Sequence, residues 1–231
     1  MNQPVILHIE TSTNVCSVAA SEGAKCLFSL SNDEGLNHAA LLSSFIEKAL
    51  EELKTQSKTL DAVAVSGGPG SYTGLRIGVS TAKGLCYGLD IPLIETGTLS
   101  VMYVPVAKDI KDKNALLCPM IDARRMEVYA ALFDAGGNIK KDAAADIITP
   151  ESYAHWLSEH VIYFFGNGSD KCKNILKHPN ARFINDITPL AENMILLALN
   201  KFNAKEFADL AYYEPFYLKE FQTTTPKGLA P

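Results

Sequence analysis

The chain has 231 residues, of which 47% are hydrophobic and 20% charged, so it can bury a core and is not globally disordered. Its formal net charge of −5 lacks the basic surface that non-specific nucleic-acid binding needs, so a partner would carry most of any such binding. It has no apolar run of membrane-helix length, no secretory-signal pattern at its start and no CxxC pair among its five cysteines, so we expect a cytoplasmic protein with reduced thiols.

The first half of the chain predicts strands, then alternating helices and strands. The period-2 and apolar runs predict strands at 5–9, 15–21, 25–30, 62–65 and 92–94. Helical spacing of apolar residues predicts helices at 36–53, 75–89 and 97–106. Strands that alternate with helices indicate an α/β layer with a partly parallel sheet, and three consecutive opening strands indicate that the sheet is mixed.

A polar stretch at 107–114 predicts a boundary between an N-terminal lobe, 1–106, and a C-terminal lobe, 107–231. The second half again opens on strands, at 116–121 and 127–133, with a hairpin turn after the second. A helix at 150–160, a strand at 161–165 and a helix at 190–202 follow, and the polar end from residue 221 predicts a loose tail. The similar openings of the two halves suggest a duplicated lobe.

A glycine-rich loop, SGGPGSYTGLR from Ser66 to Arg76, links a buried strand to a helix. Such loops can hold a phosphate on backbone N–H groups, which here would involve Gly68, Gly70 and Ser71. The loop has neither the lysine of a Walker A motif nor the GxGxxG spacing. A tight strand-to-helix turn explains the same residues, since glycine and proline are turn residues, and both interpretations stay open.

The helix after this loop carries a ridge of small side chains, because Gly74, Gly78, Ala82 and Cys86 lie four residues apart. Glycine inside a helix costs about 0.5–1 kcal/mol relative to alanine, so the ridge indicates that another backbone approaches closely. That backbone belongs either to this chain's own sheet or to a helix of another chain.

Two adjacent arginines follow a predicted strand in the sequence Asp122-Ala123-Arg124-Arg125. Arginine pairs favour an anion or carboxylate ligand, and the alternative is a surface salt-bridge cluster worth about 0–1 kcal/mol per pair. We expect Asp122 and Arg124 to form a site that faces the cleft between the lobes.

Four segments carry a resemblance to a known family: ILHIETST, AVAVSGGPGSYTGLRIGVSTAKGL, PLIETGTLS and DARRMEVYAALFD. They resemble the TsaB family, also called YeaZ, and its catalytic paralogue TsaD. The resemblance implies the two-lobed, ribonuclease H-like fold of actin, Hsp70 and sugar kinases, with mixed sheets. It also implies a non-catalytic subunit that is required for making threonylcarbamoyladenosine on tRNA beside the anticodon.

The resemblance further implies the partners of the chain. It would form a heterodimer with TsaD, with the ATPase TsaE joining the complex, and a homodimer when alone. The complex would use ATP and contact tRNA mainly through the other subunits, and no cofactor is expected on this chain. The implied interface uses two N-terminal-lobe helices through Leu42, Phe45, Ile46, Ala49, Leu53, Gly74, Leu75, Gly78, Val79 and Ala82.

The resemblance also bears on catalysis. The catalytic paralogue holds a metal with a His-x-x-x-His pair after the strand that matches 92–94, whereas Glu95 to Met102 contains no histidine, so neither a catalytic residue nor a metal site is expected. Glu10 stands where kinase-type members hold Mg²⁺-nucleotide with an aspartate, which makes Glu10 a candidate nucleotide contact. A small-molecule kinase or ATPase of the same fold is therefore the alternative function, and a metallo-glycopeptidase is the third.

Overall fold

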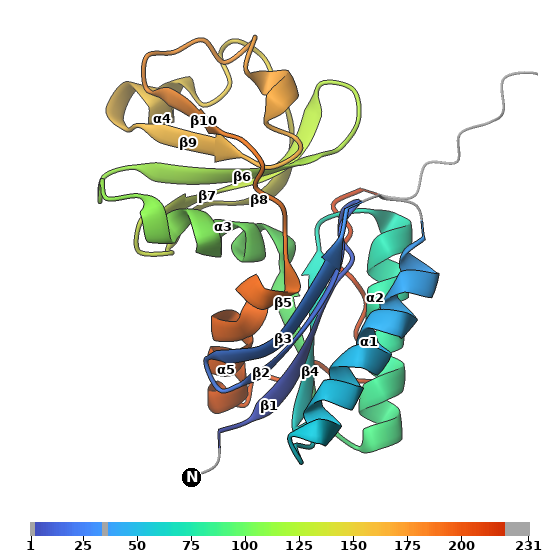
Figure 1. Cartoon of the computed structure of the whole chain (residues 1–231). Helices are drawn as coiled ribbons and strands as arrows, with labels where there is room; N and C mark the ends of the chain where they lie inside the picture. The colour runs from blue at the N-terminus through green and yellow to red at the C-terminus, as the bar shows by residue number, and fades with distance from the viewer. Residues whose placement is uncertain (1–2, 34–36, 220–231) are drawn as a thin grey trace, which may run out of the picture.

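The computed structural model describes residues 3–33 and 37–219, which form two lobes that each contain a five-stranded mixed sheet (Figure 1). In the first lobe the strand order is β3-β2-β1-β4-β5; β1, β2 and β3 are antiparallel, and β4 and β5 continue parallel to β1. Its elements are β1 (Val5–Glu10), β2 (Cys16–Glu22), β3 (Lys25–Asn32), α1 (His38–Thr55), β4 (Ala62–Gly68), α2 (Tyr72–Leu89) and β5 (Leu93–Gly97).

The second lobe repeats this topology. Its order is β10-β9-β6-β7-β8, so β6 stands in the central place of β1, with an antiparallel hairpin on one side and parallel strands on the other. The elements are α3 (Thr98–Asp109), β6 (Leu116–Asp122), β7 (Glu127–Asp134), β8 (Ile139–Ile147), α4 (Ala154–Glu159), β9 (Ile162–Phe165), η1 (Asp170–Cys172), β10 (Ala181–Ile184), η2 (Ala191–Met194) and α5 (Ile195–Ala204). The prediction of a two-lobed fold with mixed sheets and a duplicated lobe is confirmed.

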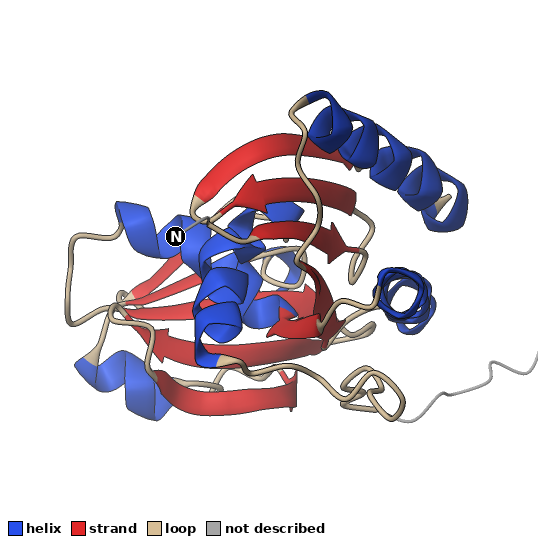
Figure 2. Ribbon diagram, turned by 90° about the horizontal axis from the view of Figure 1, so that it is seen from below, coloured by secondary structure: helices blue, strands red, loops and turns tan. Residues whose placement is uncertain are grey.

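Helices cover both faces of the first sheet, which explains why β1 and β4 are buried along their whole length. Figures 1 and 2 show α1 and α2 on one face and α5 on the other. Leu7 and Ile9 of β1 point into the core under α1 and α2, whereas Ile6 points toward Ala198 of α5. Because side chains alternate along a strand, a strand buried on both faces is continuously apolar, as 5–9 is.

The last helix returns from the second lobe to the first. Ala198 and Phe202 of α5 pack with Ile6, Ala64 and Ile94, so this face of the first sheet is covered by a helix from the end of the chain. The division at residues 106 and 107 therefore stays a prediction, and packing places residues 195–204 with the N-terminal lobe. The predicted loose tail from residue 221 lies outside the described residues.

The small-residue ridge of α2 packs against backbone of this chain, which favours the first of the two interpretations that the sequence left open; a contact of the ridge with a partner stays a prediction. Gly74, Gly78, Ala82 and Cys86 are all buried. A Cβ on Gly74 would collide with the carbonyl oxygen of Thr11, and one on Gly78 with the Thr11 hydroxyl. The glycines therefore let the turn after β1 lie directly against α2.

The other residues predicted to contact a partner are buried in the same way. Leu42, Ala49, Leu53, Leu75 and Ala82 are each at most 2% exposed. Phe45, Ile46 and Val79 are between 4% and 7% exposed and belong to the core between α1, α2 and the sheet. These side chains position the two helices, and any partner must contact the outward faces instead.

Within residues 3–33 and 37–219, none of the helices has both the length and the apolar character that a bilayer crossing demands.

Two glycines of α2 offer a matched test of this packing. Gly78→Ala should lower the free energy of unfolding by about 1–3 kcal/mol, because its Cβ would overpack against the Thr11 hydroxyl. Gly84→Ala should raise it by about 0.5–1 kcal/mol, because no atom lies within 4 Å of the new Cβ and alanine favours the helix. Urea unfolding at a protein concentration low enough to keep the chain monomeric measures both, and equal effects of the two substitutions would contradict the packing.

Candidate functional site

The glycine-rich loop between β4 and α2 uses its backbone donors within the chain. The Ser71 N–H donates to the Thr11-Ser12 turn at the Ser12 carbonyl oxygen (2.6 Å), and the Ser71 hydroxyl caps the Gly74 N–H (3.3 Å). A phosphate at the start of α2 would need such amides. These contacts favour the tight-turn interpretation, and a nucleotide contact by Gly68, Gly70 and Ser71 stays a prediction.

The glycine-rich loop packs closely against two other segments, the turn after β1 and the chain around Phe216. A Cβ on Gly70 would lie 2.8 Å from the Cβ of Ser12, and Gly68 has a φ of +115°, which glycine adopts at little cost. A Cβ on Gly68 would lie 2.5 Å from the carbonyl oxygen of Phe216, which belongs to the end of the chain. The glycines are therefore required by close packing, whether or not a ligand binds.

The segment that covers this loop, residues 206–219, is here called the C-terminal strap. The Ala208 N–H donates to the Leu93 carbonyl at the edge of the first sheet (2.9 Å), and the Phe216 N–H donates to the Gly67 carbonyl (2.7 Å). Between them, the Lys83 ammonium donates to the carbonyl of Tyr213 (3.1 Å). The strap therefore shields edge strand β5 and the glycine-rich loop.

Sequence reasoning assigned no role to the strap. Its aromatic residues, Tyr212, Tyr213, Phe216 and Tyr217, were an available signal, because such a cluster near a chain end indicates docking rather than a solvated tail. The ring of Tyr217 lies 4.8 Å from that of Tyr72 at the start of α2.

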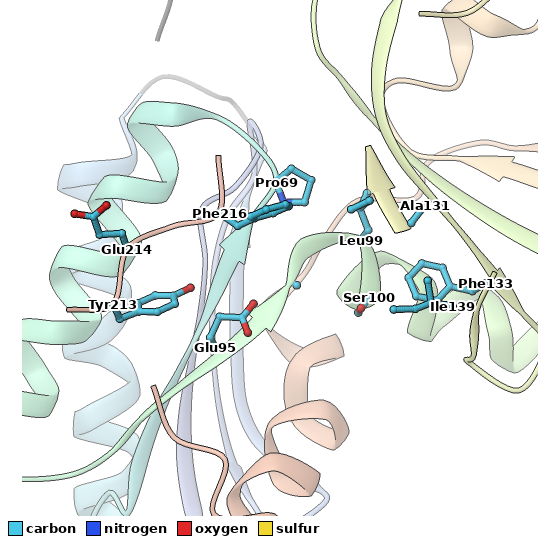
Figure 3. Close-up of a pocket in the computed structure, with 13 residues that line it drawn as sticks. Pro69, Glu95, Leu99, Ser100, Ala131, Phe133, Ile139, Tyr213, Glu214 and Phe216 are labelled. Atoms are coloured by element: carbon cyan, nitrogen blue, oxygen red, sulfur yellow. The ribbon is translucent and has the colours of Figure 1, made fainter. Parts of the chain in front are cut away.

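A pocket of about 350 Å³ lies between the lobes, beside the strap (Figure 3). Pro69, Leu99, Phe133, Ile139 and Phe216 are among the apolar side chains that line it. In Figure 3, the Tyr213 hydroxyl points toward the side chain of Glu95 on the first-lobe side of the pocket.

The polar side of this pocket is already partly paired. Lys201 of α5 forms an ion pair with Glu95 (3.0 Å). The Tyr213 hydroxyl oxygen is buried without a hydrogen-bond partner among the described residues, and burial, with the nearby charge of Glu95, raises its pKa above the usual range. Of the six predicted anion or nucleotide contacts, only Gly68 lines this pocket, so the structure does not bring that set together there.

Glu10 is a fully buried carboxyl group at the end of β1. Its Oε1 accepts the Ser12 N–H (2.6 Å), and its Oε2 has no hydrogen-bond partner among the described residues. Burial raises the pKa of Glu10 above its ordinary value of 4.5, although hydrogen bonds from Ser12 and Ser66 oppose that shift. A fully buried carboxyl with a raised pKa does not resemble the exposed carboxylate that would hold Mg²⁺-nucleotide.

Asp122 is the last residue of β6, and Arg124 lies in the turn that connects β6 to β7. The Asp122 carboxylate accepts the Arg124 N–H (2.9 Å) and forms an ion pair with Lys171. Arg124 and Arg125 have φ values of 68° and 48°, a conformation that costs non-glycine residues roughly 1–3 kcal/mol each. The salt-bridge alternative therefore holds for Asp122, whose partner is Lys171, whereas residues 3–33 and 37–219 contain no ion pair to either arginine.

The structure has no cluster of three metal-ligating side chains within residues 3–33 and 37–219. His8, on β1, is buried and its pKa is lowered to about 3, so it is neutral, with Nε2 hydrogen-bonded to the Ser21 hydroxyl (2.9 Å).

The two lobes contain five-stranded sheets of the same topology, and helices connect the parallel strands of the first sheet. This arrangement is the two-lobed fold of the actin/Hsp70/sugar-kinase type. A family model described as TsaD, tRNA N6-adenosine threonylcarbamoyltransferase, matches residues 34–226. The chain therefore belongs to the TsaD family.

Individual relatives refine this similarity. The chain is 29% identical over 231 aligned positions to the tRNA threonylcarbamoyladenosine biosynthesis protein TsaB of Escherichia coli, covering 93% of this chain and 94% of that one. It is 34% identical to TsaB of Buchnera aphidicola, but that match spans 58% of this chain and only 59% of the relative's length. YeaZ from Pseudomonas aeruginosa shares the fold, with a TM-score of 0.74 over 93% of this chain and all of that one at 24% identity.

The buried carboxyl of Glu10 gives a pH test. Its raised pKa means that the folded state favours the protonated form, so its contribution to stability is present below the unfolded-state pKa and is lost as pH rises through the folded-state value. Glu10→Gln removes this titration and keeps an acceptor for the Ser12 N–H. The difference in unfolding free energy between variant and parent should grow in the variant's favour from pH 4 to pH 8, measured by urea unfolding. A constant difference would contradict the raised pKa.

Proposed function

We propose that the chain is a non-catalytic subunit in the biosynthesis of threonylcarbamoyladenosine on tRNA, and that it acts by pairing with the catalytic TsaD subunit. One observation carries the proposal: the TsaD family match over residues 34–226, together with TsaB relatives over most of the chain. We place this activity in the cytoplasm with TsaE as a further partner of the complex, and a homodimer is the state of the chain without TsaD.

The site residues support a non-catalytic role. The segment Glu95 to Met102 supplies no histidine, and the Glu10 carboxyl is buried rather than presented to a ligand. The N–H groups of Ser71 and Gly74 are committed to the chain's own turn and cap. These features also weigh against the alternative of a kinase or ATPase. Calorimetry of the isolated chain with Mg²⁺-ATP tests that alternative, and turnover would establish it.

The outward face of α2 is the surface that we assign to the partner. Ser80, Gly84 and Gly88 are exposed small residues on α2, and the latter two have open space where a Cβ would stand. Tyr87 beside them is 84% exposed. Small residues let a partner helix approach closely, and an exposed tyrosine is an anchor typical of interfaces. The outward face of α1, which adjoins α2 on the same side of the sheet (Figure 1), would extend this surface.

A variant of this face tests the proposal. Gly84→Leu should weaken pairing with the cognate TsaD at least about tenfold, because a bulky side chain would separate helices in an interface of roughly 1,200–2,000 Å². The control is Asn203→Leu, which adds the same side chain to an exposed position on α5, on the opposite face of the sheet. Size-exclusion chromatography and calorimetry measure pairing.

The modification reaction gives the second readout. Reconstitution with TsaD, TsaE and tRNA should require this chain, and Gly84→Leu should lower the yield in proportion to lost pairing. A reaction that runs equally well without the chain would refute the proposed function. Normal pairing of Gly84→Leu would instead reject only the assigned face.

A further inference from the structure

The β6–β7 turn presents two arginines whose charge no acidic side chain of the described residues neutralises. Asp122 is paired with Lys171, and Glu127, at the other end of the turn, is paired with Lys219. No acidic side chain of the described residues pairs with Arg124 or Arg125, and both arginines are exposed. In a chain with a formal net charge of −5, this is a local positive site.

Side chains that follow β9 hold the β6–β7 turn in a fixed shape. Besides Asp122, the Lys171 ammonium donates to the carbonyl oxygens of Arg125 (2.8 Å) and Glu127 (2.7 Å). The side-chain oxygen of Asn167 accepts the Asp122 N–H (3.0 Å), which ties the turn to the loop after β9. All three ammonium hydrogens of Lys171 are therefore used to hold this one turn.

Lys171 pairs with the Asp122 carboxylate, one of the two acidic groups nearest in sequence to the two arginines. The backbone at Arg124 and Arg125 is left-handed, a strained conformation that the surrounding contacts maintain. Strain that the surroundings maintain is typical of binding sites, because a fixed backbone reduces the freedom that a ligand contact must freeze. An arginine guanidinium also matches the geometry of a phosphate oxygen pair.

We propose that residues 122–127 form a phosphate-binding turn, in which Arg124 and Arg125 contact neighbouring phosphodiester groups of the tRNA substrate. This inference rests on the proposed function, which brings tRNA to the complex. RNA presents phosphates at every nucleotide, so it can meet two adjacent guanidinium groups without a dedicated partner surface. The contact adds to tRNA binding by the complex; it does not make this acidic chain an RNA-binding protein by itself.

The test is tRNA binding by the complex reconstituted from this chain, TsaD and TsaE. Fluorescence anisotropy with unmodified tRNA is measured from 50 to 200 mM KCl. The double variant Arg124→Gln with Arg125→Gln should reduce the slope of log affinity against log salt by about 1 for each arginine removed. Binding near 100 mM salt should weaken at least about fivefold.

A matched control removes two exposed positive charges from elsewhere in the second half of the chain. Lys113→Gln with Arg182→Gln changes the net charge by the same amount, so its salt slope should stay at the parent value if the turn is a specific contact. An equal fall in both double variants would overturn the proposal, because it would show a general charge effect.

A second variant tests the role of the fixed backbone. Lys171→Met keeps both arginines but removes the three contacts that hold the turn, so tRNA binding should weaken about two- to threefold, with thermal unfolding checking that the lobe stays folded. Parent-level tRNA binding by a folded Lys171→Met variant would overturn the claim that the turn is preorganised.

The remaining outcomes separate this inference from its rivals. If the double arginine variant loses pairing with TsaD or TsaE, the turn binds an acidic protein surface. If the variant loses only Mg²⁺-ATP binding, the phosphate that the turn binds belongs to a nucleotide. Either result overturns the proposed RNA contact. Parent-level tRNA binding in a complex that assembles and modifies tRNA defeats this inference only. Failure of the complex to assemble or to need the chain defeats the proposed function.

Discussion

The contact between the turn after β1 and the start of α2 is the constraint on which the first lobe depends. The Thr11 hydroxyl donates to the Gly74 carbonyl (2.7 Å), the Ser12 carbonyl accepts the Ser71 N–H, and the glycines at 70, 74 and 78 allow that approach. This contact fixes the rotation of α2 about its axis. It therefore decides which residues of α2 enter the core and which remain outside for a partner.

The duplicated lobes show two outcomes of the same local geometry. Glu10 ends β1 and Asp122 ends β6, and a glycine-containing loop follows the parallel neighbour in both sheets. In the first lobe the carboxyl group of Glu10 is fully buried, and burial raises its pKa above the ordinary value. In the second lobe Asp122 is exposed, and Lys171, which follows the loop after β9, forms an ion pair with its carboxylate. The central strand of the first lobe therefore ends in a buried carboxyl group, whereas that of the second lobe ends in an exposed, ion-paired carboxylate.

The sequence was sufficient for the elements whose pattern is local. The opening strands, the helix from 36 and the alternation of strand and helix follow from periodicity, because each reflects a face that must be buried. Strands β8 and β10 were not predicted, since Ile139–Ile147 is half exposed and Ala181–Ile184 spans only four residues. The direction of the glycine ridge was also undetermined, because periodicity identifies a close approach but not the chain that makes it. The strap and the Lys171 contacts depend on residues far apart in sequence, which no local pattern encodes.

In the first lobe the glycine-rich loop is covered, whereas the outward face of α2 is exposed. In a nucleotide-using member of this fold, the glycine-rich loop must leave its amides available to phosphate. Here the strap crosses that loop through the bond from Phe216 to Gly67, and the Thr11–Ser12 turn occupies its other side. The same packing leaves Gly84 and Gly88 uncovered. The residues that a catalytic lobe would use for its ligand are thus used to orient a surface, which in the proposed function is the surface that binds the catalytic subunit.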